Sequence, residues 1–237
     1  MLLARDPDDS ELWLPPHKGV SELANDLDGR LTAFWRVLQS EELFPRFLRR
    51  VQAVPLSRAE WEQAAAHVYG ADPLKDAVAF FVCCRQSRAG TMKGFTPLVR
   101  TRTRRGMSDN TSAWLSAVDG LPDVHARLKR VVVENLPAVE VIKREGGLGT
   151  LFYCDPPYLH QTRASVDAYA FEMNEADHRE LLDLLLRVRG KVMLSGYPSR
   201  LYDETLRGWR RYIKEIPNHA AGGRTKATET EVLWCNF

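Results

Sequence analysis

The stretch Thr150-Leu151-Phe152-Tyr153-Cys154-Asp155-Pro156-Pro157-Tyr158 decides the predicted fold. Its apolar and aromatic residues 151–154 predict a short strand that is covered on both faces. Two prolines then prevent strand or helix from continuing, and the first biases Asp155 toward an extended backbone. Ligands of open α/β sheets bind at the carboxyl ends of strands. The sequence therefore predicts a rigid loop there, presenting a carboxylate, backbone carbonyls and an aromatic ring.

The groups of this loop fit the amino group of adenine. Asp155 can accept one of its two N–H hydrogens and the Pro156 carbonyl can accept the other, which favours the geometry in which the nitrogen acts as a nucleophile. Tyr158 can stack on the face of a base flipped out of a duplex. The alternative is an ordinary turn at a strand end, because Asp-Pro and Pro-Pro are common in loops.

This loop and its flanks resemble the Dam-type family of DNA adenine-N6 methyltransferases, which use S-adenosylmethionine (AdoMet). Asp155-Pro156-Pro157-Tyr158 matches the DPPY motif of that family. Other similar segments follow in the family's order over nearly the whole chain: 24–28, Asp177-His178, 191–197 and 231–237. The resemblance implies an α/β, Rossmann-like methyltransferase sheet. It also implies site-specific adenine methylation in double-stranded DNA, with Asp155, Pro156, Pro157 and Tyr158 as the catalytic residues.

The resemblance also implies how AdoMet would be held. The acidic motif contains Asn25 and Asp26 at the end of a strand predicted over 20–24, and Asp26 would hold the ribose hydroxyls. A helix cap is the alternative interpretation of Asp26. Pro137 stands where the family has an aspartate near the adenine of AdoMet, so Asn135 is the candidate for that contact. Asp155 completes the cofactor-binding set, and the reaction needs no metal.

One part of the family pattern is missing from this chain. The family begins with a strand that ends in a Gly-rich turn beside the methionine part of AdoMet, where only residues without side chains permit the approach. Here the first glycine, Gly19, is isolated. We therefore expect a chain that is N-terminally truncated relative to the family and binds AdoMet weakly alone. It should self-associate or require a complementing N-terminal segment.

A segment without acidic residues predicts the DNA-binding part of the chain. No Asp or Glu occurs between Asp76 and Asp109. The candidate DNA-binding residues are the cations of this window: Arg85, Arg88, Lys93, Arg100, Arg102, Arg104 and Arg105. Three of the arginines alternate with uncharged residues, so in an extended chain they would share one face and contact phosphates and base edges. Solvated surface charge is the alternative.

Helical and strand patterns alternate along the chain, which predicts a largely parallel sheet with right-handed crossovers. A helical repeat around Trp35, a capping-box pattern at Ser57 and Pro73 at a helix start predict successive helices. Strands are predicted over 131–133, 192–194, 209–216 and 231–237. We expect residues 1–84 and 126–237 to form the catalytic core and 85–125 to form a small, mainly helical, basic target-recognition insert.

Composition narrows the class of protein without identifying it. The 237 residues can bury one core, and a net charge of +2 is too small to indicate nucleic-acid binding by itself. The four cysteines lack C-x-x-C spacing, which argues against a zinc site. No apolar run reaches the ~18 residues of a membrane span, and early acidic residues argue against a signal peptide, so we expect a cytoplasmic protein.

Two rival functions stay open on the sequence alone. The chain could be a catalytically weak or inactive DNA-binding remnant or subunit that needs an N-terminal partner segment. It could also keep the chemistry and methylate adenine in RNA or a protein amide. Asn in place of Asp155 would have favoured the amide, and the basic window favours nucleic acid.

Overall fold

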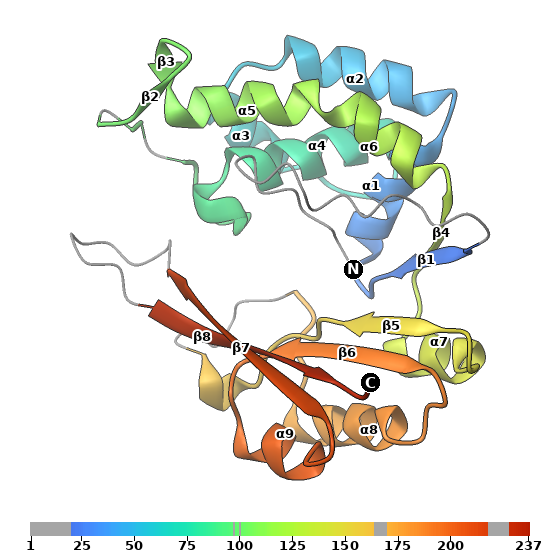
Figure 1. Ribbon diagram of the computed structural model, residues 1–237. Helices are drawn as coiled ribbons and strands as arrows, with labels where there is room; N and C mark the ends of the chain where they lie inside the picture. The colour runs from blue at the N-terminus through green and yellow to red at the C-terminus, as the bar shows by residue number, and fades with distance from the viewer. Residues whose placement is uncertain (1–19, 97, 100, 164–169, 218–227) are drawn as a thin grey trace. The chain divides into compact units, whose positions relative to one another are not determined.

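The structure is a computed structural model that describes residues 20–96, 98–99, 101–163, 170–217 and 228–237. It is mixed α/β, and the chain divides into two compact units (Figure 1). Among the described residues, the sheet unit comprises Asn25–Leu27 and 136–237, and the helical unit comprises 20–24 and Asp28–Asn135. No helix within these described ranges is long and apolar enough to cross a membrane.

The sheet unit is built on a four-stranded sheet with the order β5-β6-β8-β7. The strands are β5 (Leu151–Cys154), β6 (Lys191–Gly196), β7 (Arg210–Pro217) and β8 (Thr228–Cys235). β5 pairs with β6 in parallel, whereas β8 is antiparallel to both β6 and β7. The prediction of a largely parallel sheet is therefore confirmed here only for β5 and β6. The other two strands, β7 and β8, pair with antiparallel neighbours.

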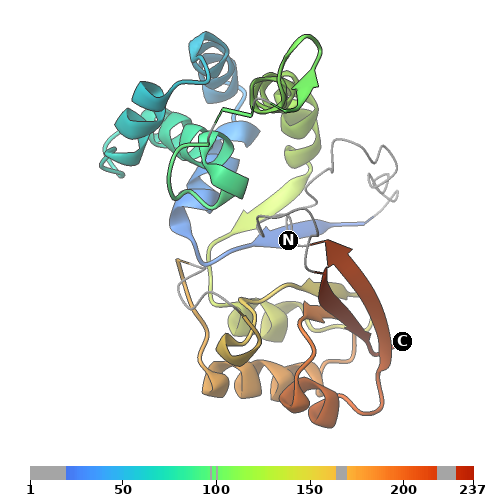
Figure 2. The same ribbon diagram turned by 90° about the vertical axis from the view of Figure 1, so that its left-hand side faces the viewer.

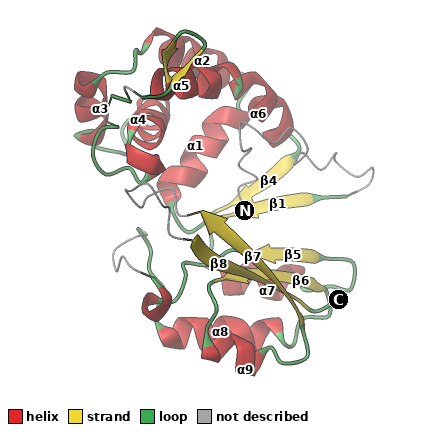
Figure 3. Ribbon diagram, turned by 60° about the vertical axis from the view of Figure 1, so that its left-hand side comes forward, coloured by secondary structure: helices red, strands yellow, loops and turns green. Residues whose placement is uncertain are grey.

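Three helices cover one face of this sheet: α7 (Ala138–Glu145), α8 (Glu175–Leu185) and α9 (Arg200–Thr205) (Figure 3). Their apolar side chains, such as Leu182 of α8, pack against Leu194 of β6 and Trp234 of β8 in one core. α8 begins with an Asn174 cap, whose side chain accepts from the backbone N–H groups of Ala176 and Asp177.

β5 is an edge strand of the described sheet, with β6 as its neighbour. Phe152 and Cys154 pack against the core, whereas Leu151 is 57% exposed and Tyr153 is 38% exposed. The prediction that β5 is covered on both faces is therefore wrong. The alternation of exposed and packed residues is that of a strand with one covered face, because α7, α8 and α9 all lie on the other side from Leu151 and Tyr153.

The helical unit contains six α-helices within the described residues, and α4 packs against α1, α2, α3 and α5 (Figure 2). Their bounds are α1 (Gly29–Gln39), α2 (Leu43–Ala53), α3 (Arg58–Ala65), α4 (Pro73–Gln86), α5 (Asp109–Asp119) and α6 (Leu121–Leu128). Phe47, Phe81 and Trp114 are fully or almost fully buried in its core. A short hairpin of β2 (Thr103–Arg104) and β3 (Met107–Ser108) precedes α5, and β1 (Glu22–Asn25) pairs with β4 (Val131–Glu134).

The compact unit that contains residues 85–125 is larger than the insert predicted from the sequence. The predicted boundary at 84/85 falls inside α4, and Phe81 of that helix packs on Trp114 of α5 at 5.4 Å between ring centroids. Helices α1–α3, which we assigned to the catalytic core, share this same hydrophobic core. The unit boundary follows the long-range packing rather than the change in charge at Arg85.

Two local predictions about helix starts have different outcomes. Asp72 caps α4 as expected, because its side chain accepts from the N–H groups of Leu74 and Lys75. The capping box predicted at Ser57 does not form: its side chain makes no cap hydrogen bond, and its N–H donates to the Gln86 side chain at 3.2 Å. The helix starts there nonetheless, since the buried Gln86 holds this turn.

Candidate functional site

The carboxylate of Asp155 is oriented by a hydroxyl on the neighbouring strand. Ser195 of β6 donates from Oγ to Asp155 Oδ1 at 2.8 Å, and the same Oγ lies 3.1 Å from the Cys154 carbonyl oxygen. The parallel pairing of Cys154 with Leu194 brings these groups together at the carboxyl ends of two adjacent strands. Ser195 is buried, whereas Asp155 is exposed. A fixed hydroxyl donor therefore orients a carboxylate that solvent and ligands can reach.

The ring of Tyr158 is held from two sides. Its hydroxyl donates to Glu231 Oε1 at 3.3 Å, and its ring meets that of Tyr197 edge to face, with 4.6 Å between centroids and 70° between planes. Tyr197 in turn donates to Glu229 Oε2 at 2.5 Å. Leu159, the next residue along the loop, is buried in the sheet-unit core. The loop is thus anchored on both sides of Tyr158.

Two ionisable groups beside the loop stay protonated at neutral pH. Burial raises the pKa of Tyr153, against the opposing effect of its hydrogen bond with Ser195, and the charges of Asp155 and Glu231 raise it further. Burial also raises the pKa of Cys154 to about 12, so this thiol is a packing residue rather than a nucleophile. The chemistry available at this loop is hydrogen-bond acceptance by carboxylate and carbonyl oxygens, together with aromatic stacking.

Sequence reasoning missed four residues of this cluster: Ser195, Tyr197, Glu229 and Glu231. Two signals could have indicated them. Ser195 directly follows the apolar run of β6, as Asp155 follows that of β5, and Tyr197 comes two residues later. Glu229 and Glu231 are two residues apart on β8 and therefore point to one face of the sheet. The pairing of Ser195 with Leu233 sets that face beside the loop, and the sequence does not reveal this register.

The acidic motif at the end of β1 contains Asn25, which has a structural role, and Asp26, which does not cap the following helix. Asn25 exchanges two hydrogen bonds with the backbone of Leu136, donating from Nδ2 to the carbonyl at 2.9 Å and accepting from the N–H at 3.0 Å. Its amide therefore ties the end of β1 to the segment before α7. Asp28, rather than Asp26, caps α1 by accepting from the N–H of Arg30. The cap interpretation of Asp26 is wrong.

The predicted cofactor-binding residues do not all belong to one unit. Asn25, the half-buried Asp26 and Asp155 belong to the sheet unit. Asn135 is exposed and is the last residue of the helical unit. The sheet unit alone therefore holds the two carboxylates of the predicted set.

The predicted DNA-binding cations lie in one stretch of the helical unit, apart from Arg100, which lies outside the described residues. Arg85 lies in the last turn of α4, Arg88 opens a single 3₁₀ turn (Arg88–Gly90), and Lys93 follows it. Arg100, Arg102 and Arg104 were expected to share one face of an extended segment; within its described residues, strand pairing is limited to Thr103 and Arg104 of β2.

The β2–β3 hairpin presents the other cations on a tight turn. Thr103 pairs with Ser108 and Arg104 with Met107, which leaves Arg105 and Gly106 as a two-residue loop. Both have positive φ, 54° and 75°, as a type I′ hairpin turn requires. An arginine in this left-handed conformation costs roughly 1 kcal/mol relative to glycine. Arg102, Arg104 and Arg105 are all exposed at this hairpin, so the strained turn directs cations outward.

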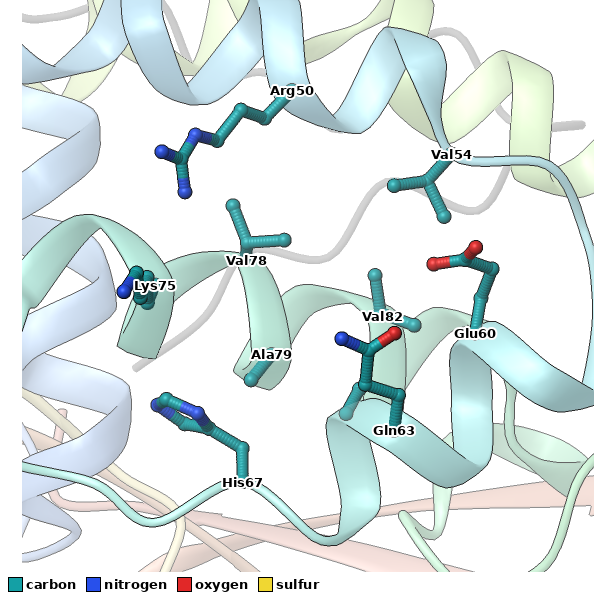
Figure 4. A pocket seen from close by; sticks show the side chains of 10 residues that line it. Arg50, Val54, Glu60, Gln63, His67, Lys75, Val78, Ala79 and Val82 are labelled. Atoms are coloured by element: carbon teal, nitrogen blue, oxygen red, sulfur yellow. The ribbon is translucent and has the colours of Figure 1, made fainter.

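A pocket of about 260 Å³ lies wholly within the helical unit, between α2, α3 and α4 (Figure 4). Its floor is apolar, with Val78, Ala79 and Val82 of α4, and its rim carries Arg50 and Lys75. None of the predicted site residues lines it. The pocket is therefore a separate feature from both the loop after β5 and the basic hairpin.

Among the described residues, no group of three or more His, Cys, Asp or Glu side chains is arranged to hold a metal ion. A scan against protein-family models finds no matching family, and a search of curated proteins finds no match to this chain.

Proposed function

We propose that this chain is a site-specific, AdoMet-dependent DNA adenine-N6 methyltransferase with a Rossmann-like catalytic sheet. The observation that carries the proposal is the paired fixation of Asp155 by Ser195 and of Tyr158 by Glu231. A carboxylate and an aromatic ring, both held at the carboxyl ends of adjacent strands, form the two walls that a flipped adenine requires. The ordering of motifs along the chain supports the same assignment.

The residues of the loop would act by positioning and by charge. Asp155 would accept one N–H of the adenine amino group and the Pro156 carbonyl the other, so that the nitrogen lone pair points toward the incoming methyl group. The same oxygens stabilise the positive charge that develops on nitrogen and lie ready for the proton that leaves it. Tyr158 would stack on the base. The proposed transfer is direct, from the sulfonium of AdoMet to the adenine nitrogen, and needs no covalent enzyme intermediate.

AdoMet would supply the methyl group as a sulfonium that carries its own leaving group. The half-buried Asp26 at the end of β1 fits a ribose-binding carboxylate, since α1 is capped by Asp28 instead. Asn25 would act indirectly, because its amide is bonded to Leu136. Asn135 is proposed for the adenine of AdoMet on the resemblance alone. No metal takes part in the proposed reaction.

The helical unit would provide binding to double-stranded DNA. The exposed arginines of the β2–β3 hairpin can neutralise phosphates, and a narrow two-residue turn fits a groove where side chains reach base edges. Residues 85–125 would then be the target-recognition part of a larger helical unit. A protein acting on chromosomal DNA in this way would be cytoplasmic.

A second candidate is a DNA-binding subunit that methylates only with an added N-terminal segment, or through self-association. The position of β5 favours this candidate, because β5 is an edge strand of the described sheet and its Leu151 exposes an apolar side chain. An edge strand of this kind can pair with another chain. RNA adenine remains an alternative substrate for the same chemistry, since phosphate contacts do not distinguish the two polymers.

The test is AdoMet-dependent methylation of duplex DNA by the protein and by Asp155→Ala. The variant should retain the fold, because Asp155 is exposed, and should lose adenine methylation. Asp183→Ala, which removes an exposed carboxylate from α8, is the matched control and should keep full activity. Equal methylation by the wild type and Asp155→Ala would rule out the proposed role of the loop.

A further inference from the structure

The side chains that contact Tyr158 come from two other places in the sheet unit. Glu231 is on β8, and Tyr197 follows the end of β6. Tyr197 is itself bonded to Glu229, two residues from Glu231 on the same strand. The two glutamates therefore hold two tyrosine hydroxyls from one face of β8, and the two rings meet edge to face.

We propose that Glu231 is a positioning residue that sets the plane of the Tyr158 ring, and that Tyr197 supports it through the edge-to-face contact. This inference rests on the proposed function for its consequence, because the ring plane matters when a base stacks on it. The fixation itself is a property of the side chains and is independent of any ligand.

The geometry explains how these two contacts orient the ring. A tyrosine side chain has two rotatable bonds, so a hydrogen bond at its distal hydroxyl limits the swing of the ring. An edge-to-face neighbour at 4.6 Å limits its rotation about the remaining axis. The Tyr158 hydroxyl lies 3.3 Å from Glu231 Oε1, a long hydrogen bond that contributes orientation more than strength. A ring held in this way is already oriented before the base arrives.

A pre-oriented ring would act on the rate of methyl transfer more than on DNA affinity. Phosphate contacts dominate affinity, whereas the flipped base must be held in line for transfer. Loss of the Glu231 anchor keeps the ring for stacking but removes the contact that limits its swing. We therefore expect kcat to fall while KM for DNA changes little.

The central experiment is a double-mutant cycle on Tyr158→Phe and Glu231→Ala in the full chain. Each single change removes the same hydrogen bond, so each should lower the single-turnover methylation rate by a similar factor, about fivefold, as for an ordinary hydrogen bond. The double variant should be no slower than either single variant, because the bond is already absent. Independent, multiplying losses would overturn the proposal.

Two further variants test whether the effect of Glu231 depends on its hydrogen bond and whether it is specific to this position. Glu231→Gln keeps an acceptor of similar size and should recover most of the rate lost in Glu231→Ala. Glu215→Gln changes an exposed carboxylate on β7 and should have no effect. A loss with Glu215→Gln equal to that with Glu231→Ala would show a general charge effect and overturn the positioning role.

A readout that does not depend on activity keeps this inference distinct from the proposed function. In the protein labelled with ¹³Cζ-tyrosine, the Tyr158 resonance, assigned from Tyr158→Phe, should shift in Glu231→Ala and stay unchanged in Glu215→Gln. An unshifted resonance overturns the positioning role even if methylation is robust. A shifted resonance in a protein without any adenine methylation would support the fixation and refute the proposed function.

Discussion

Removing the hairpin arginines should weaken the salt dependence of DNA binding by an amount that the structure allows us to estimate. The triple variant Arg102→Gln, Arg104→Gln and Arg105→Gln neutralises three exposed cations at one hairpin. If each contacts one phosphate, the log–log slope of affinity against salt should fall in magnitude by up to about 2.7. Between 50 and 200 mM salt, the wild type should therefore lose about 40-fold more affinity than the variant.

Fluorescence anisotropy with a labelled duplex at several salt concentrations measures both slopes. The control removes three exposed arginines from the sheet unit, Arg187→Gln, Arg189→Gln and Arg207→Gln, and keeps the same net charge as the hairpin variant. This control should retain the wild-type slope. An unchanged slope in the hairpin variant, or an equal reduction in the control, would show that the hairpin arginines are solvated surface charges.

Three further predictions concern the sheet unit. Burial lowers the pKa of His178, so the unfolded chain binds a proton at this residue more readily than the folded chain does. The free energy of unfolding should therefore decrease as pH falls below about 6.5. Urea titrations of His178→Gln should show a smaller decrease, and an equal decrease would contradict the assignment. Ser195→Ala removes the donor to Asp155 and should slow single-turnover methylation about tenfold, whereas an unchanged rate would show that Asp155 needs no orientation. Leu151→Lys should reduce self-association through the edge of β5 in sedimentation velocity; wild-type protein that stays monomeric at high concentration would refute that use of the edge.

The elements that the sequence predicts well are those with strong local signals. Pro73 at the start of a helix and the apolar run that ends before Asp155 both specify their structures within a few residues. The strand predicted over 131–133 is found as β4 and follows from the same kind of pattern. Local propensity and tertiary packing agree at these positions, so the sequence is sufficient.

The predictions that failed depend on contacts between distant residues. The exposure of Leu151 depends on which face of the sheet the helices cover, and no pattern inside a four-residue strand specifies that. The predicted boundary at 84/85 falls inside α4, whose Phe81 packs on Trp114, more than thirty residues away. Ser57 has the sequence of a capping box, yet its N–H is satisfied by Gln86 instead.

The candidate site divides in the same way. Asp155 and Tyr158 are recognisable because a short motif carries their chemistry. The residues that hold them could not be recognised in the sequence, since Glu231 reaches Tyr158 only through the antiparallel register of β8 against β6. The sequence does not show which of Asp26 and Asp28 caps the helix and which is the candidate ligand. Either carboxylate lies close enough in sequence to a helix start near Gly29 to cap it.

The most direct test of the central claim is the amount of N6-methyladenine formed in duplex DNA in a single turnover. Protein in excess over DNA and a saturating concentration of AdoMet make weak cofactor binding tolerable, and mass spectrometry of the digested DNA identifies the product. We predict N6-methyladenine with the wild type and none with Asp155→Ala. The absence of N6-methyladenine with the wild type, or equal amounts with both proteins, would contradict the assignment of the loop after β5 as the site of methyl transfer.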